Sequence, residues 1–293
     1  MTLVPASDHR GSATPRGPFK LFATDLDGTL LDRNGHIHEV DRRAIAELAR
    51  RGVIVTILTG RMYSGTRDVA RALSLDGPVG CLDGSSIVAV RDDRHLLSRA
   101  LCVEGGRVLQ AALAGSGRAV FVLGGDRIVH DAHGARFAQY LQSWTSRISH
   151  VEDVSAAAHW NGESGVAGAI AVGTKDEIDA LVATLSTATD LLGSVAFPVE
   201  VDAPGHWAMM ARAAGATKGS ALEWIAAHHG IEMREVVCVG DWQNDVPMFK
   251  VAGCSFVMGH ASDEVKVHAT EHLRADVTTG GGIAEAAERA GLL

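Results

Sequence analysis

The chain has 293 residues, of which 46% are hydrophobic and 21% charged, and its 27 Lys and Arg against 35 Asp and Glu give a formal charge of −8. This length suggests about two domains, and the composition excludes intrinsic disorder of the whole chain. The acidic balance excludes a general binder of nucleic acid or anionic membranes, which needs a basic surface, but it leaves room for a local anion site.

The cysteine pattern and the lack of a targeting or membrane segment predict that the protein is cytoplasmic. The four cysteines, Cys81, Cys102, Cys238 and Cys254, are widely spread and form no CxxC pair, so we expect reduced thiols rather than disulfides or a metal site. The sequence contains no apolar run long enough for a transmembrane helix. Residues 1–18 lack an apolar signal core and are rich in Gly, Pro, Ser and Arg, so we expect a flexible extension outside the fold.

Strands and helices alternate in the first part of the predicted fold. Short apolar runs at 20–24, 53–58 and 79–82 predict strands, and periodic apolar residues at 38–51 and 64–73 predict the helices between them. The run at 53–58 is β-branched and continuous, which favours a parallel strand covered on both faces. This order is typical of a doubly wound α/β sheet.

The last part of the chain repeats this alternation, whereas the middle follows an α+β pattern that begins with a hairpin at 87–90 and 95–101. In the middle, we further predict helices at 103–114, 135–145 and 177–186 and strands at 119–123, 127–130, 166–172 and 196–201. In the last part, we predict strands at 236–239 and 255–258 and helices at 218–229, 244–251, 263–269 and 283–290. The predicted fold is therefore α/β, a Rossmann-like doubly wound parallel sheet core formed by 19–85 and 209–293, with an inserted α+β cap domain at 86–208.

Polar residues follow the predicted strands at the point where each strand ends. These are Asp25-Leu-Asp-Gly-Thr29, Thr59-Gly-Arg61 and Gly240-Asp-Trp-Gln-Asn-Asp245, and Thr217-Lys218-Gly219 opens the helix after the insert. Ligands of open α/β sheets bind at the carboxyl ends of the strands, so these groups converge on one rim. Metal-assisted phosphoryl transfer needs a carboxylate nucleophile, oxygen ligands for Mg²⁺, and a lysine and a hydroxyl that bind the phosphoryl oxygens.

Simpler explanations exist for each motif taken alone. The DxDG segment could open a calcium loop, but that loop wants Gly where Leu30 stands and a carboxylate where Thr29 stands. Each acidic pair could also be a turn with a helix cap. Four such pieces in order, each at a strand end or helix start, favour the catalytic interpretation.

The four segments FATDLDGTLLD, ILTGR, TKGSAL and VGDWQNDVPMF resemble the haloacid dehalogenase (HAD) superfamily, specifically its Cof-type phosphatases, which carry an α/β cap between the second and third motifs. The resemblance extends over nearly the whole chain from about residue 19. It implies Asp25 as nucleophile and Asp27 as general acid and then general base. It also implies a Mg²⁺ site formed by the Asp25 carboxylate, the Asp27 carbonyl and the Asp241 carboxylate.

The same resemblance implies phosphate-binding residues, namely Thr59, Gly60, Lys218 and Asn244. Asn244 and Asp245 would lie in or next to the metal's coordination shell, with Asp245 orienting Lys218 or a metal-bound water. The presence of both Asp27 and Asp241 favours a phosphatase over the dehalogenase-like and ion-pumping relatives.

Two departures from the Cof-type pattern concern the cap. Asp83-Gly84-Ser85 replaces the usual Asn-Gly-Ala, which we interpret as a turn, the alternative being an extra carboxylate that disfavours very anionic substrates. The stretch 201–217 is longer than expected and suggests a modified hinge. His159 and His206, in the presumed cap and hinge, are candidates for substrate specificity, and the alternative for both is a packing or surface role.

The sequence thus predicts an enzyme, a Mg²⁺-dependent phosphomonoester hydrolase that acts on a small phosphorylated metabolite, a sugar phosphate first, through an aspartyl-phosphate. The alternatives are a phosphomutase or phosphotransferase acting on sugar phosphates and a non-catalytic, metabolite-binding regulatory protein. We expect no nucleic-acid or membrane partner, and a cytoplasmic monomer or homodimer.

Overall fold

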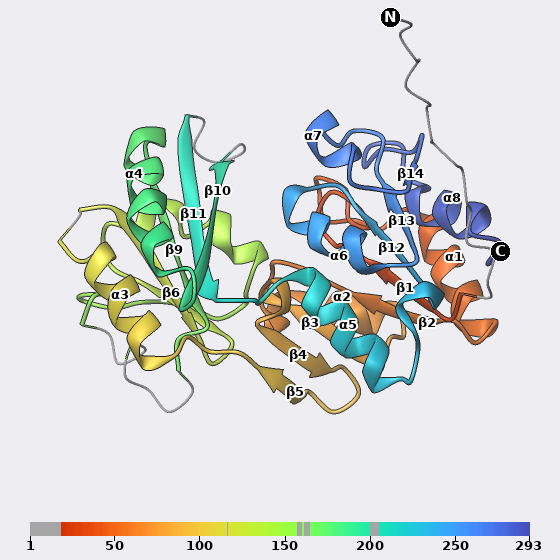
Figure 1. The fold of residues 1–293 in the computed structure, drawn as a ribbon, viewed down its shortest axis with the longest axis horizontal. Coiled ribbons are helices and arrows are strands. Elements are labelled where there is room, and N and C mark those ends of the chain that lie inside the picture. The colour runs from red at the N-terminus through yellow and green to blue at the C-terminus, as the bar shows by residue number, and fades with distance from the viewer. Residues whose placement is uncertain (1–18, 116, 157–159, 161–164, 200–204) are drawn as a thin grey trace, which may run out of the picture.

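The computed structural model describes residues 19–115, 117–156, 160, 165–199 and 205–293. The predicted extension at 1–18 lies outside these residues. Figure 1 shows two bodies, a core built from both ends of the chain and an insert built from its middle, connected by the segments that leave β5 (Arg94–Ser98) and enter α5 (Lys218–His228). The predicted fold class, a doubly wound α/β core with an inserted cap, is confirmed.

The core contains a parallel sheet with the strand order β14-β13-β12-β1-β2. Its strands are β1 (Leu21–Thr24), β2 (Ile54–Ile57), β12 (Val236–Gly240), β13 (Cys254–Val257) and β14 (Glu271–His272). Strand β1 pairs with β2 on one side and with β12 on the other, although β12 comes from the far end of the chain. This pairing brings the polar residues that follow β1 and β12 together at one edge of the sheet.

Helices cover both faces of this sheet. One face packs against α1 (Glu39–Arg50), α2 (Tyr63–Ala72) and α8 (Gly282–Arg289), and the other against α5, α6 (Val246–Val251) and α7 (Asp263–Lys266). In β1 the side chains alternate, since Phe22 lies in the first cluster while Leu21 and Ala23 lie in the second. All three side chains are fully buried, which explains the apolar strand sequence.

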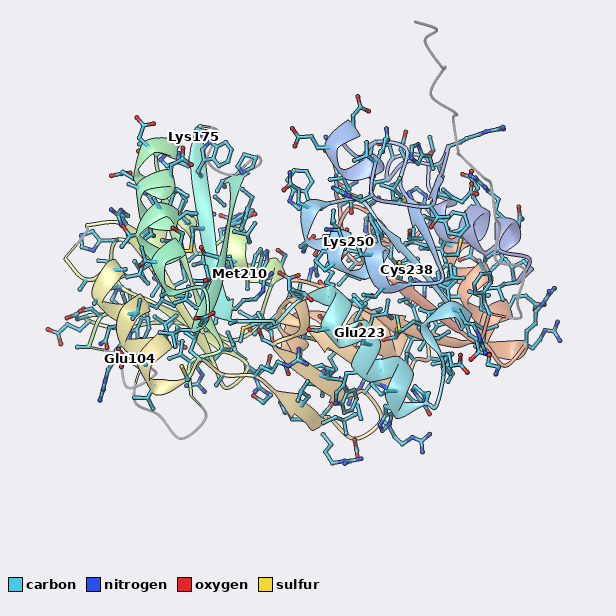
Figure 2. All side chains as sticks on the ribbon, viewed as in Figure 1. Glu104, Lys175, Met210, Glu223, Cys238 and Lys250 are labelled. Atoms are coloured by element: carbon cyan, nitrogen blue, oxygen red, sulfur yellow. The ribbon has the colours of Figure 1, made fainter. Side chains whose placement is uncertain are left out.

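The insert is a six-stranded sheet in the order β10-β11-β9-β6-β7-β8, in which only β7 and β8 pair in parallel. Its elements are α3 (Val103–Leu113), β6 (Ala119–Gly124), β7 (Arg127–His130), β8 (Ile148–His150), β9 (Gly168–Gly173), α4 (Lys175–Leu185), β10 (Leu192–Val199) and β11 (His206–Ala213). Helices α3 and α4 cover one face. The opposite face contains Met210 (Figure 2) and packs with Met62 and Leu82 of the core.

Two predicted elements of the middle differ from the structure. Residues 135–145 were expected to form one helix but form two 3₁₀ turns, η2 (Ala135–Phe137) and η3 (Tyr140–Ser143), whose hydrogen bonds span three residues. The stretch 201–217, expected to be a modified hinge, contains β11. Strands β8 and β14 were not predicted. Further 3₁₀ turns are η1 (Leu82–Gly84), η5 (Ser186–Ala188), η6 (Met233–Glu235) and η7 (Gln243–Asp245).

The predicted hairpin consists of β4 (Ser86–Ala89) and β5, and it pairs with β3 (Pro78–Cys81) of the core rather than with the insert's sheet. Its residues Ile87 and Val88 are buried in the two core clusters. We therefore propose that the insert runs from the end of β5 to the end of β11, in place of the boundaries 86 and 208. Among the described residues, no helix is both long and apolar enough to cross a membrane.

Candidate active site

Asp25 lies at the carboxyl end of β1, where its backbone N–H donates to the Val239 carbonyl of β12 at 2.9 Å. This bond extends the sheet pairing by one residue and aims the side chain beyond the sheet edge. The Asp25 residue is only 4% exposed, and its Oδ1 accepts a hydrogen bond from Lys218 Nζ at 2.5 Å. A nucleophile predicted from the first motif and a lysine predicted from the third are therefore in direct contact.

Lys218, the first residue of α5, is 1% exposed and bridges two carboxylates. Its Nζ also donates to Asp245 Oδ1 at 2.6 Å. The other oxygen of Asp245 accepts the backbone N–H groups of Asp241 and Trp242, each at 2.9 Å. Asp245 thus fixes both the lysine and the loop that carries Asp241, which fits the orienting role expected for it.

Burial and charge oppose each other at this cluster. Burial alone would lower the pKa of Lys218, but Asp245 and Asp25 hold it well above its usual value, so the side chain is cationic. Burial raises the pKa of Asp25, and the charges of Asp245 and Asp241 raise it further, against the lowering effect of Lys218. One ammonium therefore faces three carboxylates, and the cluster carries an excess of negative charge.

Asp25, Asp241 and Asp245 each offer an oxygen atom within 4.8 Å of the others, all from buried residues. Thr29 Oγ1 donates to Asp241 Oδ1 at 2.8 Å, and His260 Nε2 lies 3.4 Å from Asp241 Oδ2. Hard carboxylate oxygens are the ligands that Mg²⁺ prefers, and a divalent cation would offset the excess charge. The donor set therefore fits the metal expected from the sequence.

Gly28 allows the chain to turn directly after Asp25 and Asp27, the two aspartates of the first motif. Its φ of +83° is in the left-handed region, and a Cβ placed there would lie 2.5 Å from Asp241 Oδ2. The glycine is needed both for the turn and for the close approach of Asp241.

Asp27 points away from the cluster. Its side chain is 54% exposed and forms a two-pronged ion pair with Arg61, in which Arg61 Nε donates to Asp27 Oδ2 at 2.7 Å and Nη2 donates to Oδ1. Its carboxylate is therefore separate from that of Asp25, as an acid and base distinct from the nucleophile would require. That the backbone carbonyl of Asp27 is a metal ligand stays a prediction.

The expected phosphate-binding residues lie around the loop that contains Asp83. Thr59 is 1% exposed, and its carbonyl accepts the Asp83 N–H at 3.0 Å. Asn244 Nδ2 donates to Asp83 Oδ1 at 2.9 Å, and a Cβ on Gly60 would lie 3.6 Å from the same oxygen. The second and fourth motifs thus meet at the Asp83 loop, and Lys218 of the third motif lies in the neighbouring carboxylate cluster.

Asp83 forms a turn and is also paired. Leu82 and Asp83 both have a φ of +49°, consistent with the predicted turn. The buried Asp83 carboxylate lies 3.2 Å from Arg212 Nη1 of β11, so its charge is compensated. Arg212 was not predicted as a site residue, because nothing in its local sequence indicates a partner. Arg61, the partner of Asp27, is part of the second motif, but no feature of the sequence assigned it a role.

Of the two histidine candidates, His159 lies outside the described residues. His206 begins β11 and packs against Phe137, with ring centroids 5.3 Å apart. Its backbone is about 20 Å along the strand from Arg212, at about 3.3 Å per residue. Its role in specificity stays a prediction.

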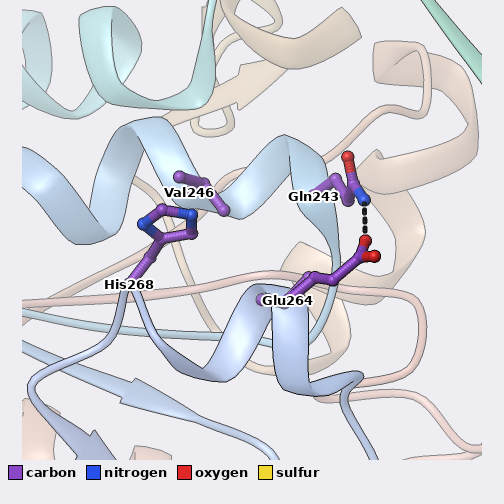
Figure 3. Close-up of a pocket in the computed structure, with 5 residues that line it drawn as sticks. Gln243, Val246, Glu264 and His268 are labelled. Atoms are coloured by element: carbon purple, nitrogen blue, oxygen red, sulfur yellow. Dashed lines mark hydrogen bonds between the residues drawn. The ribbon is translucent and has the colours of Figure 1, made fainter.

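A pocket of about 320 Å³ lies beside the fourth motif, lined by Gln243, Val246, Glu264, Val265 and His268 (Figure 3). Gln243 Nε2 donates to Glu264 Oε2 at 3.3 Å across it. None of the three clustered aspartates lines this pocket. The Gln243–Glu264 bond connects the fourth motif to α7 and supports the loop from outside the site.

Residues 22–286 match the family model of haloacid dehalogenase-like hydrolases, and the chain therefore belongs to this family. Among curated proteins it is similar to the stress response protein YhaX of Bacillus subtilis, with 25% identity over 84% of this chain and 85% of that protein. It is also similar to the HMP-PP phosphatase of Serratia proteamaculans, with 24% identity over 85% of this chain and 86% of the relative. A B. subtilis 5-amino-6-(5-phospho-D-ribitylamino)uracil phosphatase, YcsE, is 26% identical over 84% and 86%.

Solved structures share the fold. A haloacid dehalogenase-like hydrolase from Bacteroides thetaiotaomicron superposes with a TM-score of 0.78 at 22% identity, covering 92% of this chain and 99% of that one. A HAD subclass IIB sugar phosphatase gives a TM-score of 0.76 at 20% identity, covering 94% and 100%. The predictions of a Cof-type HAD superfamily member and of a phosphatase are confirmed.

Proposed function

We propose that this phosphatase is a Mg²⁺-dependent phosphomonoesterase that acts on a small phosphorylated metabolite, with a sugar phosphate as the first candidate, through an aspartyl-phosphate. The observation that carries the proposal is the contact of buried Lys218 with both Asp25 and Asp245. The cluster that contains it lies at the carboxyl ends of β1 and β12, where α/β sheets bind ligands.

Asp25 and Asp241, with Asp245 beside them, would hold Mg²⁺, which when bound supplies charge that offsets the phosphoryl oxygens and the nucleophile. Asp25 attacks phosphorus, so that a bond from its carboxylate oxygen to phosphorus forms while the bond to the leaving oxygen breaks. Lys218 and Thr59 stabilise the charge on the phosphoryl oxygens.

Asp27 handles the protons of both steps. It gives its proton to the leaving oxygen and then takes one from the water that attacks phosphorus, which breaks the bond to Asp25 and releases phosphate. In the structure Asp27 is bound to Arg61, so this ion pair must open before the carboxyl group reaches the leaving oxygen. Because Asp27 is half exposed, it can make this exchange.

The substrate class rests on the relatives. Two are named as phosphatases of HMP-PP and of 5-amino-6-(5-phospho-D-ribitylamino)uracil, and a structural neighbour as a sugar phosphatase. Each of these names refers to a small phosphorylated metabolite or to sugar phosphates as a class. The cytoplasmic location, the monomer or homodimer and the absence of nucleic-acid and membrane partners stay predictions.

The test is the release of phosphate from p-nitrophenyl phosphate and from a panel of sugar phosphates with Mg²⁺. Asp25→Asn should abolish release, and Asp27→Asn should slow turnover or trap a phosphoenzyme. Asp153→Asn changes an exposed aspartate whose hydrogen bonds, within the described part of the chain, are to its own loop; it is the matched control and should retain activity. Full activity of Asp25→Asn would refute the mechanism, and isomerised ester without free phosphate would identify a mutase instead.

A further inference from the structure

The turn η1 lies where the core meets β11, the strand through which the chain leaves the insert. The Asp83 side chain in this turn is 4% exposed and contacts both bodies. Its Oδ1 accepts a hydrogen bond from Asn244 Nδ2 of the core at 2.9 Å, and its Oδ2 lies 3.2 Å from Arg212 Nη1 of β11. We propose that Asp83 and Arg212 are positioning residues, through which the insert sets the orientation of Asn244 in the phosphate site. This inference rests on the proposed function and on the phosphate-binding role predicted for Asn244.

A carboxylate suits position 83 because both of its neighbours are donors. The Asn244 amide and the Arg212 guanidinium each offer N–H groups, and an ionised carboxylate accepts hydrogen bonds through both of its oxygens. The asparagine that the Cof-type pattern has here carries one acceptor and one NH₂ donor, so its NH₂ group would face one of the two donors. Asp83 and Arg212 therefore belong together, and the arginine explains why this chain departs from the pattern.

The Asp83 carboxylate fixes the direction of the Asn244 amide. Because the carboxylate only accepts, the NH₂ group of Asn244 is directed toward it and the amide carbonyl away from it. This bond uses one of the two N–H groups on Nδ2, and the amide plane then holds the second N–H in one direction, from which it can donate to a phosphoryl oxygen. Asn244 directly precedes Asp245, the partner of Lys218, so the amide and the lysine are positioned by one loop.

The turn that carries Asp83 is held by the second and third motifs. The Asp83 N–H donates to the carbonyl of Thr59 at 3.0 Å, which joins the turn to the second motif. Gly84 has a φ of +94°, and a Cβ there would overlap the carbonyl oxygen of Thr217, so the turn lies directly against the start of α5. Since Lys218 is the first residue of that helix, the turn is fixed relative to the carboxylate cluster.

Arg212 is held by the insert. Its side chain is 12% exposed, and its Nε donates to the carbonyl of Ala216 at 2.9 Å. Its backbone pairs with Gly168 of β9 on one side and with Gly193 of β10 on the other. A shift of this sheet relative to the core therefore moves the guanidinium away from Asp83. The ion pair thus makes the direction of the Asn244 amide depend on where the insert sits.

The experiment is steady-state hydrolysis of p-nitrophenyl phosphate by the full chain with Mg²⁺, together with inhibition by inorganic phosphate. Asp83→Asn and Arg212→Met should each raise KM and the inhibition constant of phosphate about 10-fold, the effect of losing one hydrogen bond to a charged group. The turnover number kcat should change less, because Asn244 contacts the phosphoryl group before and during the reaction. Arg91→Met is the matched control, since it removes an arginine from an exposed ion pair with Asp76, and it should leave both constants unchanged.

The double variant Asp83→Asn/Arg212→Met separates positioning from a merely structural role. With the arginine gone, the carbonyl of the new asparagine is able to accept from Asn244, so phosphate inhibition should recover to within about 3-fold of the wild type. Melting temperatures of all variants are to be measured in parallel, and Asp83→Asn, which keeps the size of the side chain, should remain folded.

Three results would overturn the inference. These are unchanged KM and phosphate inhibition in both single variants, a double variant in which the two losses add, and an equal loss in the Arg91→Met control. A wild-type chain that hydrolyses no phosphate ester would refute the proposed function and this inference with it. An active wild type with unaffected variants would refute the inference alone.

Discussion

Replacing Lys218 by methionine removes the one buried cation of the carboxylate cluster while it keeps a side chain of similar length. The ammonium group lies 2.5 Å from Asp25 and 2.6 Å from Asp245, and all three residues are buried. Removing one partner of a buried pair costs about 3–5 kcal/mol because the remaining charge is left uncompensated. Two carboxylates lose their partner here, so we expect the upper part of that range.

The free energy of unfolding is to be measured by urea denaturation followed by circular dichroism, without added Mg²⁺. Lys175→Met is the matched control, because Lys175 lies 2.5 Å from Asp179 in an ion pair whose side chains are 55% and 52% exposed. Such an exposed pair contributes less than about 1 kcal/mol. A loss in Lys218→Met no greater than that in Lys175→Met would show that the cluster is not stabilised by its lysine and would refute this reasoning.

The remaining predictions concern a turn and the thiols. Gly28→Ala should destabilise the fold by at least about 1–2 kcal/mol, because alanine is strained in a left-handed backbone, and it should remove the stabilisation by Mg²⁺, because its Cβ displaces Asp241. Gly35→Ala is the control, since Gly35 has a φ of +78° and nothing near a Cβ, and it should show the backbone cost alone. Both variants are to be compared by urea denaturation with and without Mg²⁺. Burial raises the pKa of Cys81 to about 12 and of Cys254 to about 11, and it raises that of Cys238 well above the usual value. A thiol reagent at mildly alkaline pH should therefore label only exposed Cys102 in the folded protein and all four cysteines in urea, and fast labelling of a second thiol in the native state would contradict this.

The core and the cluster were predictable because both follow from local sequence. Buried parallel strands such as 53–58 are continuous apolar runs, and the polar residues after them must meet at one sheet edge. Asp25 and Lys218 could therefore be placed on the same rim before their contact was known. The glycine at 28 indicated a turn directly after Asp27, which allows the carboxylates of Asp25 and Asp27 to point in different directions.

The insert was harder to predict, since its strands have weak local signals. Strand β11 reads His-Trp-Ala-Met-Met-Ala-Arg-Ala, and alanine and methionine are not strand-forming residues, so only pairing with β9 and β10 makes it a strand. The Asp83–Arg212 ion pair depends on that strand and could not be found without it. Periodic apolar residues at 135–145 indicated a helix, but the chain forms 3₁₀ turns there, with Phe137 and Leu141 buried against the insert's sheet.

The division of the core between the two ends of the chain has a consequence for synthesis. Thr29 and Asp241, which are hydrogen bonded, are separated by 212 residues, and ribosomes add about 5–20 residues per second, so β1 waits on the order of 10–40 s for β12. During this time the insert, whose segments are contiguous, is able to fold, while one edge of β1 and its apolar residues stay uncovered. The catalytic cluster is therefore able to form only after the whole insert has been synthesised, and a nascent chain that ends before β12 carries the complete insert but no active site.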